Sequence, residues 1–246
     1  MKHLLFSLTI LFSVNLAAQE EAPKPVEDDF NRFQIGVSYA PEMSYRTLLN
    51  VDGSNAAKNT IDFRNEMELP KYGFTAGING CYNISRKIGF EAGILFSNKG
   101  YQERSMFYTV LNTDGTYQEL GKHKYIYQFH YIDIPLKANF TLGKQKVRFL
   151  ASAGIVTSIF VSSAETHLIN YYDDGVERAT VEDPYKYKRG MLSAMVGAGI
   201  DYAITQRMTL RVEPRFRYGL TRIIDNTPIS ARLGDFGINV GYYITM

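Results

Sequence analysis

The chain has 246 residues, in which 27 lysines and arginines nearly balance 25 aspartates and glutamates, and it contains one cysteine. A balanced charge gives no electrostatic footprint for nucleic acid, and a single cysteine excludes a fold held together by intramolecular disulfides. The 18 tyrosines and 15 phenylalanines, with no tryptophan, are typical of a chain rich in β-strands.

The first 18 residues predict a secretory signal peptide. A basic start precedes an apolar run from Leu4 to Val14, and two alanines follow it. The run is shorter than the ~20 residues that a membrane-spanning helix needs. Residues 19–30 are acidic and contain proline, so they cannot bury apolar surface and are expected to form a periplasmic tether. A single domain of residues 31–246 follows.

Apolar and polar residues alternate with a period of two through this domain, which predicts strands with two different faces. In the segment "MTLRVEPRFRYGL", for example, Leu210 and Val212 alternate with Arg211 and Glu213. No stretch shows the apolar periodicity of a helix, so none is expected after the signal peptide. The eight predicted strands lie near residues 32–40, 71–84, 88–100, 130–140, 147–163, 190–204, 208–220 and 234–244.

The connections between these segments alternate in length, as in an even-stranded barrel with short periplasmic turns and longer outer loops. The short ones are "SRK", "LGKQK" and "TQR". Two of the long loops contain hairpin signals, at Asp114-Gly115 and Asp174-Gly175, which predict ribbons that continue beyond the membrane. The long connections cover roughly residues 42–70, 98–123, 163–189 and 223–230.

Alternation alone leaves two architectures open. A soluble lipocalin-like barrel would turn its apolar face inward, whereas a membrane barrel would turn it toward lipid. The second face of these strands is rich in glycine, serine and asparagine and also carries charges, as the crowded interior of a narrow barrel requires. Together with the signal peptide and the loop pattern, this favours an all-β fold, an eight-stranded antiparallel transmembrane β-barrel.

Charges on the second face are expected to form a network inside the barrel, because charges withdrawn from bulk water need partners. Arg148, Arg211, Arg215 and Arg217 should fill the interior. The complete predicted network is Glu91, Asp133, Lys137, Arg148, Asp201, Arg211, Glu213, Arg215, Arg217 and Asp235.

Two prolines, Pro135 and Pro214, fall within predicted strands. A proline in mid-strand removes a hydrogen-bond donor from the ladder. Each is therefore expected to mark a bulge or a register adjustment.

The motifs "YIDIP", "RFRYGLT" and "GYYI" resemble the PorT-like outer membrane beta-barrel family of Bacteroidetes-type bacteria, from about residue 30 to the end. The resemblance implies an exported eight-stranded barrel that the barrel insertion machinery places in the outer membrane. It does not imply a defined activity, although the namesake branch is associated with protein secretion. Such barrels commonly end on an aromatic residue, and Tyr243 is expected to substitute for it in "YYITM".

No catalytic, cofactor or metal site is predicted. His130 and Asp133 are three residues apart, which places them on opposite faces of a strand, and His123 and His167 have no visible partner. Cys81 is expected to be a small interior residue. An acidic group is more typical of a solvated loop than of a calcium site. Its members are Asp173, Asp174, Glu177, Glu182 and Asp183.

The sequence therefore predicts a non-enzymatic outer membrane barrel with a structural or surface-interaction role for its long loops. Its predicted partners are the lipid bilayer and the insertion machinery, together with an unidentified surface or envelope protein. Three alternatives stay open: a small channel, a component of a secretion or envelope assembly, and an outer-membrane lipid-modifying enzyme.

Overall fold

The computed structural model describes residues 32–143, 146–173, 175–182, 187–224 and 228–246. The chain separates into two units, residues 1–30 and 31–246. The predicted signal peptide and tether fall on the first unit, outside the described residues. Within the described ranges, no helix has both the length and the apolar character to cross a membrane.

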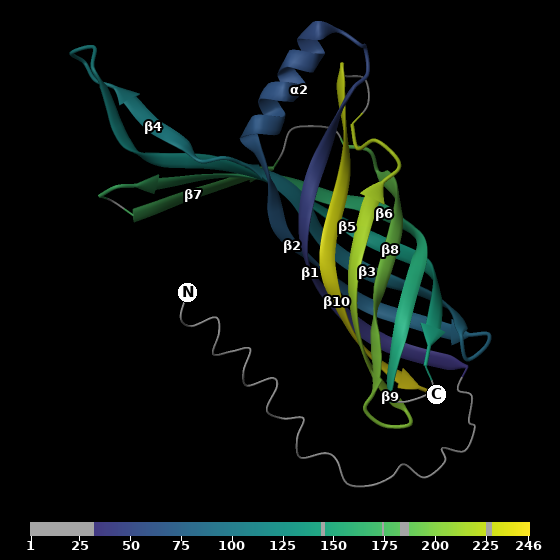
Figure 1. Ribbon diagram of the computed structural model, residues 1–246. Coiled ribbons are helices and arrows are strands. Elements are labelled where there is room, and N and C mark those ends of the chain that lie inside the picture. Colours follow the sequence, from purple (N-terminus) through teal and green to yellow (C-terminus); the bar gives the residue numbers. More distant parts are fainter. Residues whose placement is uncertain (1–31, 144–145, 174, 183–186, 225–227) are drawn as a thin grey trace. The chain divides into compact units, whose positions relative to one another are not determined.

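The described residues form one antiparallel sheet and a helix (Figure 1). Eight strands close into a ring in the order β1, β2, β3, β5, β6, β8, β9, β10, and β10 pairs back onto β1. The predicted eight-stranded all-β barrel is confirmed. The elements are β1 (Phe33–Asn50), α2 (Asn55–Met67), β2 (Glu68–Asn83), β3 (Ile88–Glu103), β4 (Met106–Leu111), β5 (Tyr117–Leu142), β6 (Val147–Tyr171), β7 (Gly175–Glu182), β8 (Gly190–Ala203), β9 (Met208–Gly219) and β10 (Ile229–Thr245).

The apolar face of the ring points outward. Val37, Ile94 and Phe149 expose 58%, 67% and 67% of their surface, whereas the alternate positions on the same strands are buried or half-buried. A soluble barrel would bury these side chains, so the lipocalin-like alternative is excluded. A continuous apolar belt around a closed ring is stable only against an apolar surrounding, such as lipid.

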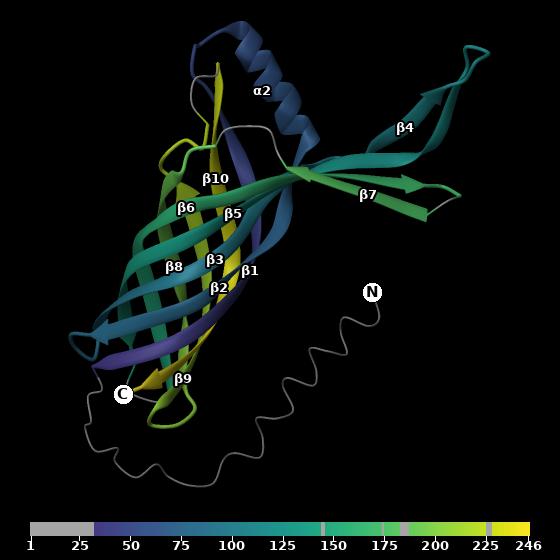
Figure 2. The ribbon, with the colours of Figure 1, turned by 180° about the vertical axis from the view of Figure 1, so that it is seen from behind.

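Strands β4 and β7 lie outside the ring. Strand β4 pairs with the first residues of β5, and β7 pairs with the last residues of β6. Because β5 and β6 also pair with each other here, the four segments form a sheet in the order β4, β5, β6, β7. We call this the outer sheet. It projects from the barrel at the end opposite the C-terminus (Figures 1 and 2).

The predicted hairpin at Asp114-Gly115 is confirmed as the β4–β5 turn. The Asp114 carboxylate accepts a hydrogen bond from the Thr116 backbone N–H at 2.9 Å, and Gly115 has a φ of 82°. Residue 174 of the second hairpin lies outside the described residues, but Gly175 also has a positive φ of 86°. Positive φ is the conformation for which turns select glycine.

The expectation of no helix is wrong, because α2 occupies the first long loop. Ser54 caps it by accepting a hydrogen bond from the Ala57 N–H at 3.1 Å. Only Ala57 is buried along the helix, so the segment has no apolar stripe that a periodicity argument could detect. The capping serine ahead of a run of polar helix formers was the available signal.

The expectation of bulges at the two prolines is also wrong. The β3–β5 register is the same on both sides of Pro135, with Ala92 opposite Leu136 and Leu95 opposite Asp133. Pro214 lies in a β8–β9 ladder whose register is equally constant. Each proline interrupts pairing with one neighbour over two positions without adding a residue, so the other neighbouring strand holds the alignment.

Contact with lipid should alternate between successive residues along each strand. In a Cys81→Ser background, we expect a fluorescent reporter at Phe149→Cys or Ile155→Cys to be strongly quenched by a bilayer-confined quencher, because both native side chains face outward. A reporter at Ser158→Cys, on the inner face of the same strand, should be quenched weakly. Equal quenching at the three positions would contradict an outward apolar face.

Candidate functional site: the charged interior of the barrel

The interior is built around β9. Arg211, Glu213, Arg215 and Arg217 alternate with apolar residues, so the pleat turns all four inward, and each is at least nine-tenths buried. A buried charge without a partner costs several kcal/mol, so each of these groups requires neighbours of opposite charge.

The half of the network nearer the short turns consists of Glu91, Lys137, Asp201, Arg211 and Glu213, which we call the turn-side cluster. The Arg211 guanidinium donates to both Asp201 oxygens at 2.7 and 3.0 Å and to Glu91 Oε2 at 2.6 Å. The Lys137 ammonium bridges Glu91 at 3.3 Å and Glu213 at 2.8 Å. These contacts connect β3, β5, β8 and β9 across the interior.

Neutral donors complete the coordination of these carboxylates. The Asn139 amide donates to Glu91 Oε2 at 3.0 Å, and the Tyr243 hydroxyl donates to Glu91 Oε1 at 3.1 Å. The Ser152 hydroxyl donates to Glu213. Tyr243, which the sequence suggested as a substitute terminal aromatic, is fully buried with its ring against Arg211.

The half nearer the long loops, the loop-side cluster, consists of Glu42, Lys99, Asp133, Arg215, Arg217 and Asp235. Arg217 contacts three carboxylates: Asp235 at 3.1 Å, Glu42 at 3.3 Å and Asp133. Arg215 donates twice to Glu42, at 2.5 and 3.0 Å. Lys99 lies 3.1 Å from Asp133 and 3.6 Å from Asp235.

The two clusters together hold five cations and six anions, and Arg148, at the short-turn edge of the interior, supplies the sixth cation. Arg148 lies 3.9 Å from Asp201, and its side chain is 31% exposed. The six cations are Lys99, Lys137, Arg148, Arg211, Arg215 and Arg217, and the six anions are Glu42, Glu91, Asp133, Asp201, Glu213 and Asp235. The structure thus brings nine of the ten predicted network residues into the buried clusters and places Arg148 at their edge.

Two members of the network were missed from sequence. The sequence pattern places Glu42 in a long loop, but β1 continues to Asn50 and carries Glu42 inward. Lys99 lies within a predicted strand and has the same parity as Glu91, so counting in steps of two from Glu91 would have found it. For Glu42 the signal was the same alternation, extended two residues past the expected strand end.

An apolar cluster closes the interior above the loop-side cluster. Tyr101, Phe129 and Tyr131 pack there against Leu233 and against Ile223 from the last loop. Two backbone hydrogen bonds fix that loop residue, from Lys188 N–H to the Ile223 carbonyl and from Ile223 N–H to the Ala231 carbonyl, both at 2.9 Å. The barrel is therefore filled by paired charges and closed at the loop end by apolar side chains.

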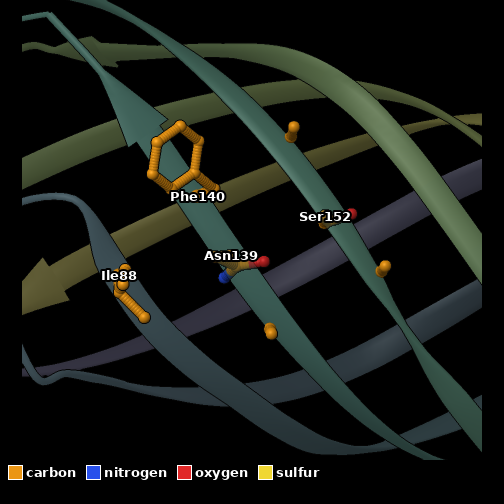
Figure 3. A pocket seen from close by; sticks show the side chains of 7 residues that line it. Ile88, Asn139, Phe140 and Ser152 are labelled. Carbon is orange, nitrogen blue, oxygen red and sulfur yellow. The ribbon is translucent and has the colours of Figure 1, made fainter.

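A shallow hollow of about 300 Å³ lies on the wall over β3, β5 and β6. Figure 3 shows Ile88 and Phe140 projecting from neighbouring strands beside it. Three alanines also line it, and its two polar lining residues, Asn139 and Ser152, are hydrogen-bonded to the buried carboxylates. The hollow offers acyl chains an apolar recess and presents no catalytic group.

The remaining candidate residues do not converge on a reaction centre. His130 faces the outer wall, where it stacks on Phe96, while Asp133 is buried inside. Cys81 is a buried free thiol near Asn139. Of the acidic loop group, Asp174 and Asp183 lie outside the described residues, and Glu177 accepts from the Tyr171 hydroxyl at 2.9 Å. Within the described ranges, no three potential ligands cluster to hold a metal ion.

The expectation that His123 and His167 lack partners is wrong. They lie across the β5–β6 pair of the outer sheet, with His123 Nδ1 3.1 Å from His167 Nε2. Tyr125 stacks on His167 at 4.5 Å. Burial and the neighbouring His167 lower the pKa of His123. The cross-strand pairing that brings the two rings together depends on β6 extending to Tyr171, which the sequence pattern did not show.

A model of the outer membrane protein beta-barrel domain matches residues 17–225. The chain belongs to this outer membrane barrel family. Its location is therefore the outer membrane, and the surrounding of its apolar belt is the lipid bilayer. A search of curated proteins gives no match.

Among solved structures, the barrel is similar to Neisserial surface protein A, with 14% identity over 87% of this chain and 97% of that chain and a TM-score of 0.41. It is similar to the attachment invasion locus protein Ail of Yersinia pestis, with 12% identity over 87% and 99% and a TM-score of 0.35. It is also similar to the outer membrane protease OmpT from Escherichia coli, with 9% identity over 92% and 99% and a TM-score of 0.41.

Replacing Arg217 should destabilise this barrel more than any exposed substitution. Arg217→Met leaves three buried carboxylates with fewer cations, so we expect the free energy of unfolding to fall by about 3–5 kcal/mol. Urea titration of the reconstituted barrel measures this. Arg148→Met, at the partly exposed rim, should cost less than about 1 kcal/mol. Equal losses in the two variants would mean that the buried pairing is not what stabilises the interior.

The closed interior should not conduct ions. Purified wild-type barrel in a planar bilayer should show no stable single-channel steps, because paired charges fill the interior and the apolar cluster around Phe129 and Ile223 seals one end. A porin reconstituted in the same bilayers is the positive control. Reproducible large steps from the barrel would favour the channel alternative instead.

Proposed function

We propose that this protein is a non-enzymatic outer membrane barrel that acts at the cell surface through its outer sheet. The observation that carries the proposal is the contrast between a filled, closed interior and an outer sheet that exposes apolar side chains and free edges. The filled interior leaves no open surface inside the barrel to which a partner could bind. The outer sheet provides a surface suited to binding another protein.

The outer sheet exposes several large apolar side chains. Phe107, Leu111 and Tyr117 are each more than half exposed, and Leu111 and Tyr117 are direct cross-strand neighbours at the β4–β5 hairpin. On the opposite edge, Val176 and Val181 of β7 are also more than half exposed. Exposed apolar groups clustered on a projecting element are characteristic of interaction sites.

The edges of the outer sheet support the same proposal. Within the described chain, β4 and β7 each pair on one side only. Every residue of β7 is exposed. An open edge offers backbone N–H and C=O groups to an added strand, which is a common mode of protein recognition.

The proposal extends to origin and export. The motifs "YIDIP", "RFRYGLT" and "GYYI" support membership of the PorT-like branch of Bacteroidetes-type bacteria. The first 18 residues would direct export, and the barrel insertion machinery would place the chain in the outer membrane. A role within a secretion or envelope assembly would use the same outer sheet, so it is a special case of this proposal.

The test is site-specific photo-crosslinking in intact cells of the source bacterium. A crosslinker at Val110, on the exposed β4 strand, should give a discrete protein product that disappears in the Leu111→Ser, Tyr117→Ser double variant, because those changes remove the apolar contact surface. Phe63→Ser on α2, at a residue of similar exposure, should leave the product unchanged. A product lost equally in both variants, or none at Val110, would contradict the proposal.

A further inference from the structure

A second polar group runs through the wall of the barrel, outside the interior network, from the buried Lys71 to the exposed Ser162. Lys71 of β2, Asn98 of β3, His130 of β5 and Ser162 of β6 form a chain across four strands. The Lys71 ammonium donates to Asn98 Oδ1 at 2.5 Å, Asn98 Nδ2 lies 3.1 Å from His130 Nε2, and His130 Nδ1 lies 3.2 Å from Ser162 Oγ. We call these four residues the wall relay.

The chemistry of Lys71 sets the direction of every hydrogen bond in the relay. An ammonium can only donate, so the Asn98 atom that it touches is the carbonyl oxygen, and the Asn98 amide N–H must donate to His130 Nε2. A neutral imidazole that accepts at Nε2 carries its proton on Nδ1, which then donates to Ser162 Oγ. The Ser162 hydroxyl hydrogen is left to donate outward from the exposed end.

Two bulges assemble the relay. On β6, His130 lies opposite Ser162 while Tyr131 lies opposite Phe160, so one extra residue shifts the register and brings a hydroxyl to His130 in place of Val161. On β2, three residues between Pro70 and Phe74 face two on β3. Bulges that aim a side chain are frequent beside functional sites.

A glycine supplies the path for the lysine. Gly100 has a φ of 153°, and a Cβ there would lie 1.9 Å from the Tyr127 carbonyl oxygen and 3.3 Å from Lys71 Cδ. A side chain at this position would therefore block the passage of Lys71 toward Asn98. The local backbone is shaped to deliver a buried ammonium to the wall.

The relay lies at the boundary between lipid tails and headgroups. A row of rings crosses the outer wall at its level, from Tyr39 through Phe74 and Phe96 to His130, with centroids 5.7 to 6.1 Å apart. Aromatic girdles mark the interfaces of membrane barrels. Strand β3 extends about 33 Å from Ile88, at the short-turn end, to Asn98. At a strand tilt of ~40° this length spans about 25 Å along the membrane normal, which is the height of the apolar band of a membrane barrel.

The charge of Lys71 is not compensated by the protein. The residue is 8% exposed, and in the described part of the chain its ammonium contacts only neutral oxygens, from Asn98 and from the Tyr72 carbonyl at 3.1 Å. The interior lysines, Lys99 and Lys137, each contact two carboxylates. A cation that has no counter-ion in the described chain and stands at one end of a row of hydrogen bonds is stabilised by an anion supplied from outside.

We propose that the wall relay binds the phosphate of an outer-leaflet lipid headgroup, with the Ser162 hydroxyl as a donor and Lys71 as the source of positive charge. The same direction of hydrogen bonds argues against a serine hydrolase, since a general base must accept the serine proton and His130 instead donates to Ser162. The relay is thus a recognition site, separate from the outer sheet.

The test measures binding of diphosphorylated lipid A to the barrel in nonionic detergent by native mass spectrometry. Ser162→Ala should weaken binding several-fold, because it removes the hydroxyl that donates to the phosphate. Lys71→Met should weaken binding about tenfold or more, because it removes the positive charge that attracts the phosphate. Thr157→Ala removes an exposed hydroxyl from the wall of the same strand and should change nothing. Because Ser162 is exposed, its variant remains informative even where Lys71→Met folds poorly.

Two further arms separate the alternatives. Dephosphorylated lipid A should bind no better to the wild type than to Ser162→Ala, and inorganic phosphate at millimolar concentration should not displace the lipid. Displacement by phosphate alone would overturn the lipid assignment in favour of a free anion site. Release of fatty acid from the lipid, abolished in Ser162→Ala, would overturn the recognition site in favour of a nucleophilic serine. Equal lipid binding by all variants would overturn the site itself.

Discussion

Charge neutralisation inside a closed eight-stranded ring is the constraint on which the rest of this structure depends. Such a ring holds side chains but no bulk water, so a charge that the pleat turns inward must meet its counter-charge inside. Arg217 illustrates the result, because its three carboxylate partners come from β1, β5 and β10. The interior is therefore a cross-link between strands that are far apart in sequence as well as a filler.

The same constraint selects the register of the ring. A slip of one residue in β9 would turn Arg211, Glu213, Arg215 and Arg217 toward lipid and bring their apolar neighbours inside. Ring closure depends on the same contacts, since Arg215 reaches Glu42 on β1 and Tyr243 of β10 reaches Glu91 on β3. One alignment satisfies all these pairs together, and alternatives leave charges in hydrocarbon.

The faces of the strands could be predicted from sequence because a period of two is a local property. The inward positions of Asp133, Arg211 and Asp235 follow from it directly. The pairing within the network could not be predicted, because which carboxylate Arg217 meets depends on ring order and stagger, which no local pattern encodes. Helix α2 was missed because its sequence lacks an apolar stripe, and the wall relay because two bulges change the parity on which the prediction relied.

The irregularities in the ladders lie where the two proposed binding surfaces are found. The register shifts in the described ladders occur near Pro70, Tyr108 and His130, at or beyond the aromatic row, whereas the ladders nearer the short turns keep constant register even at Pro135. Inside the hydrocarbon layer an unpaired backbone group is costly, so an extra residue there, which would leave a group unsatisfied, is disfavoured. At the headgroup level water and lipid phosphates can satisfy such groups. A break in the ladder therefore costs least near the long-loop end of the barrel and in the outer sheet, where the register shifts of this chain are found.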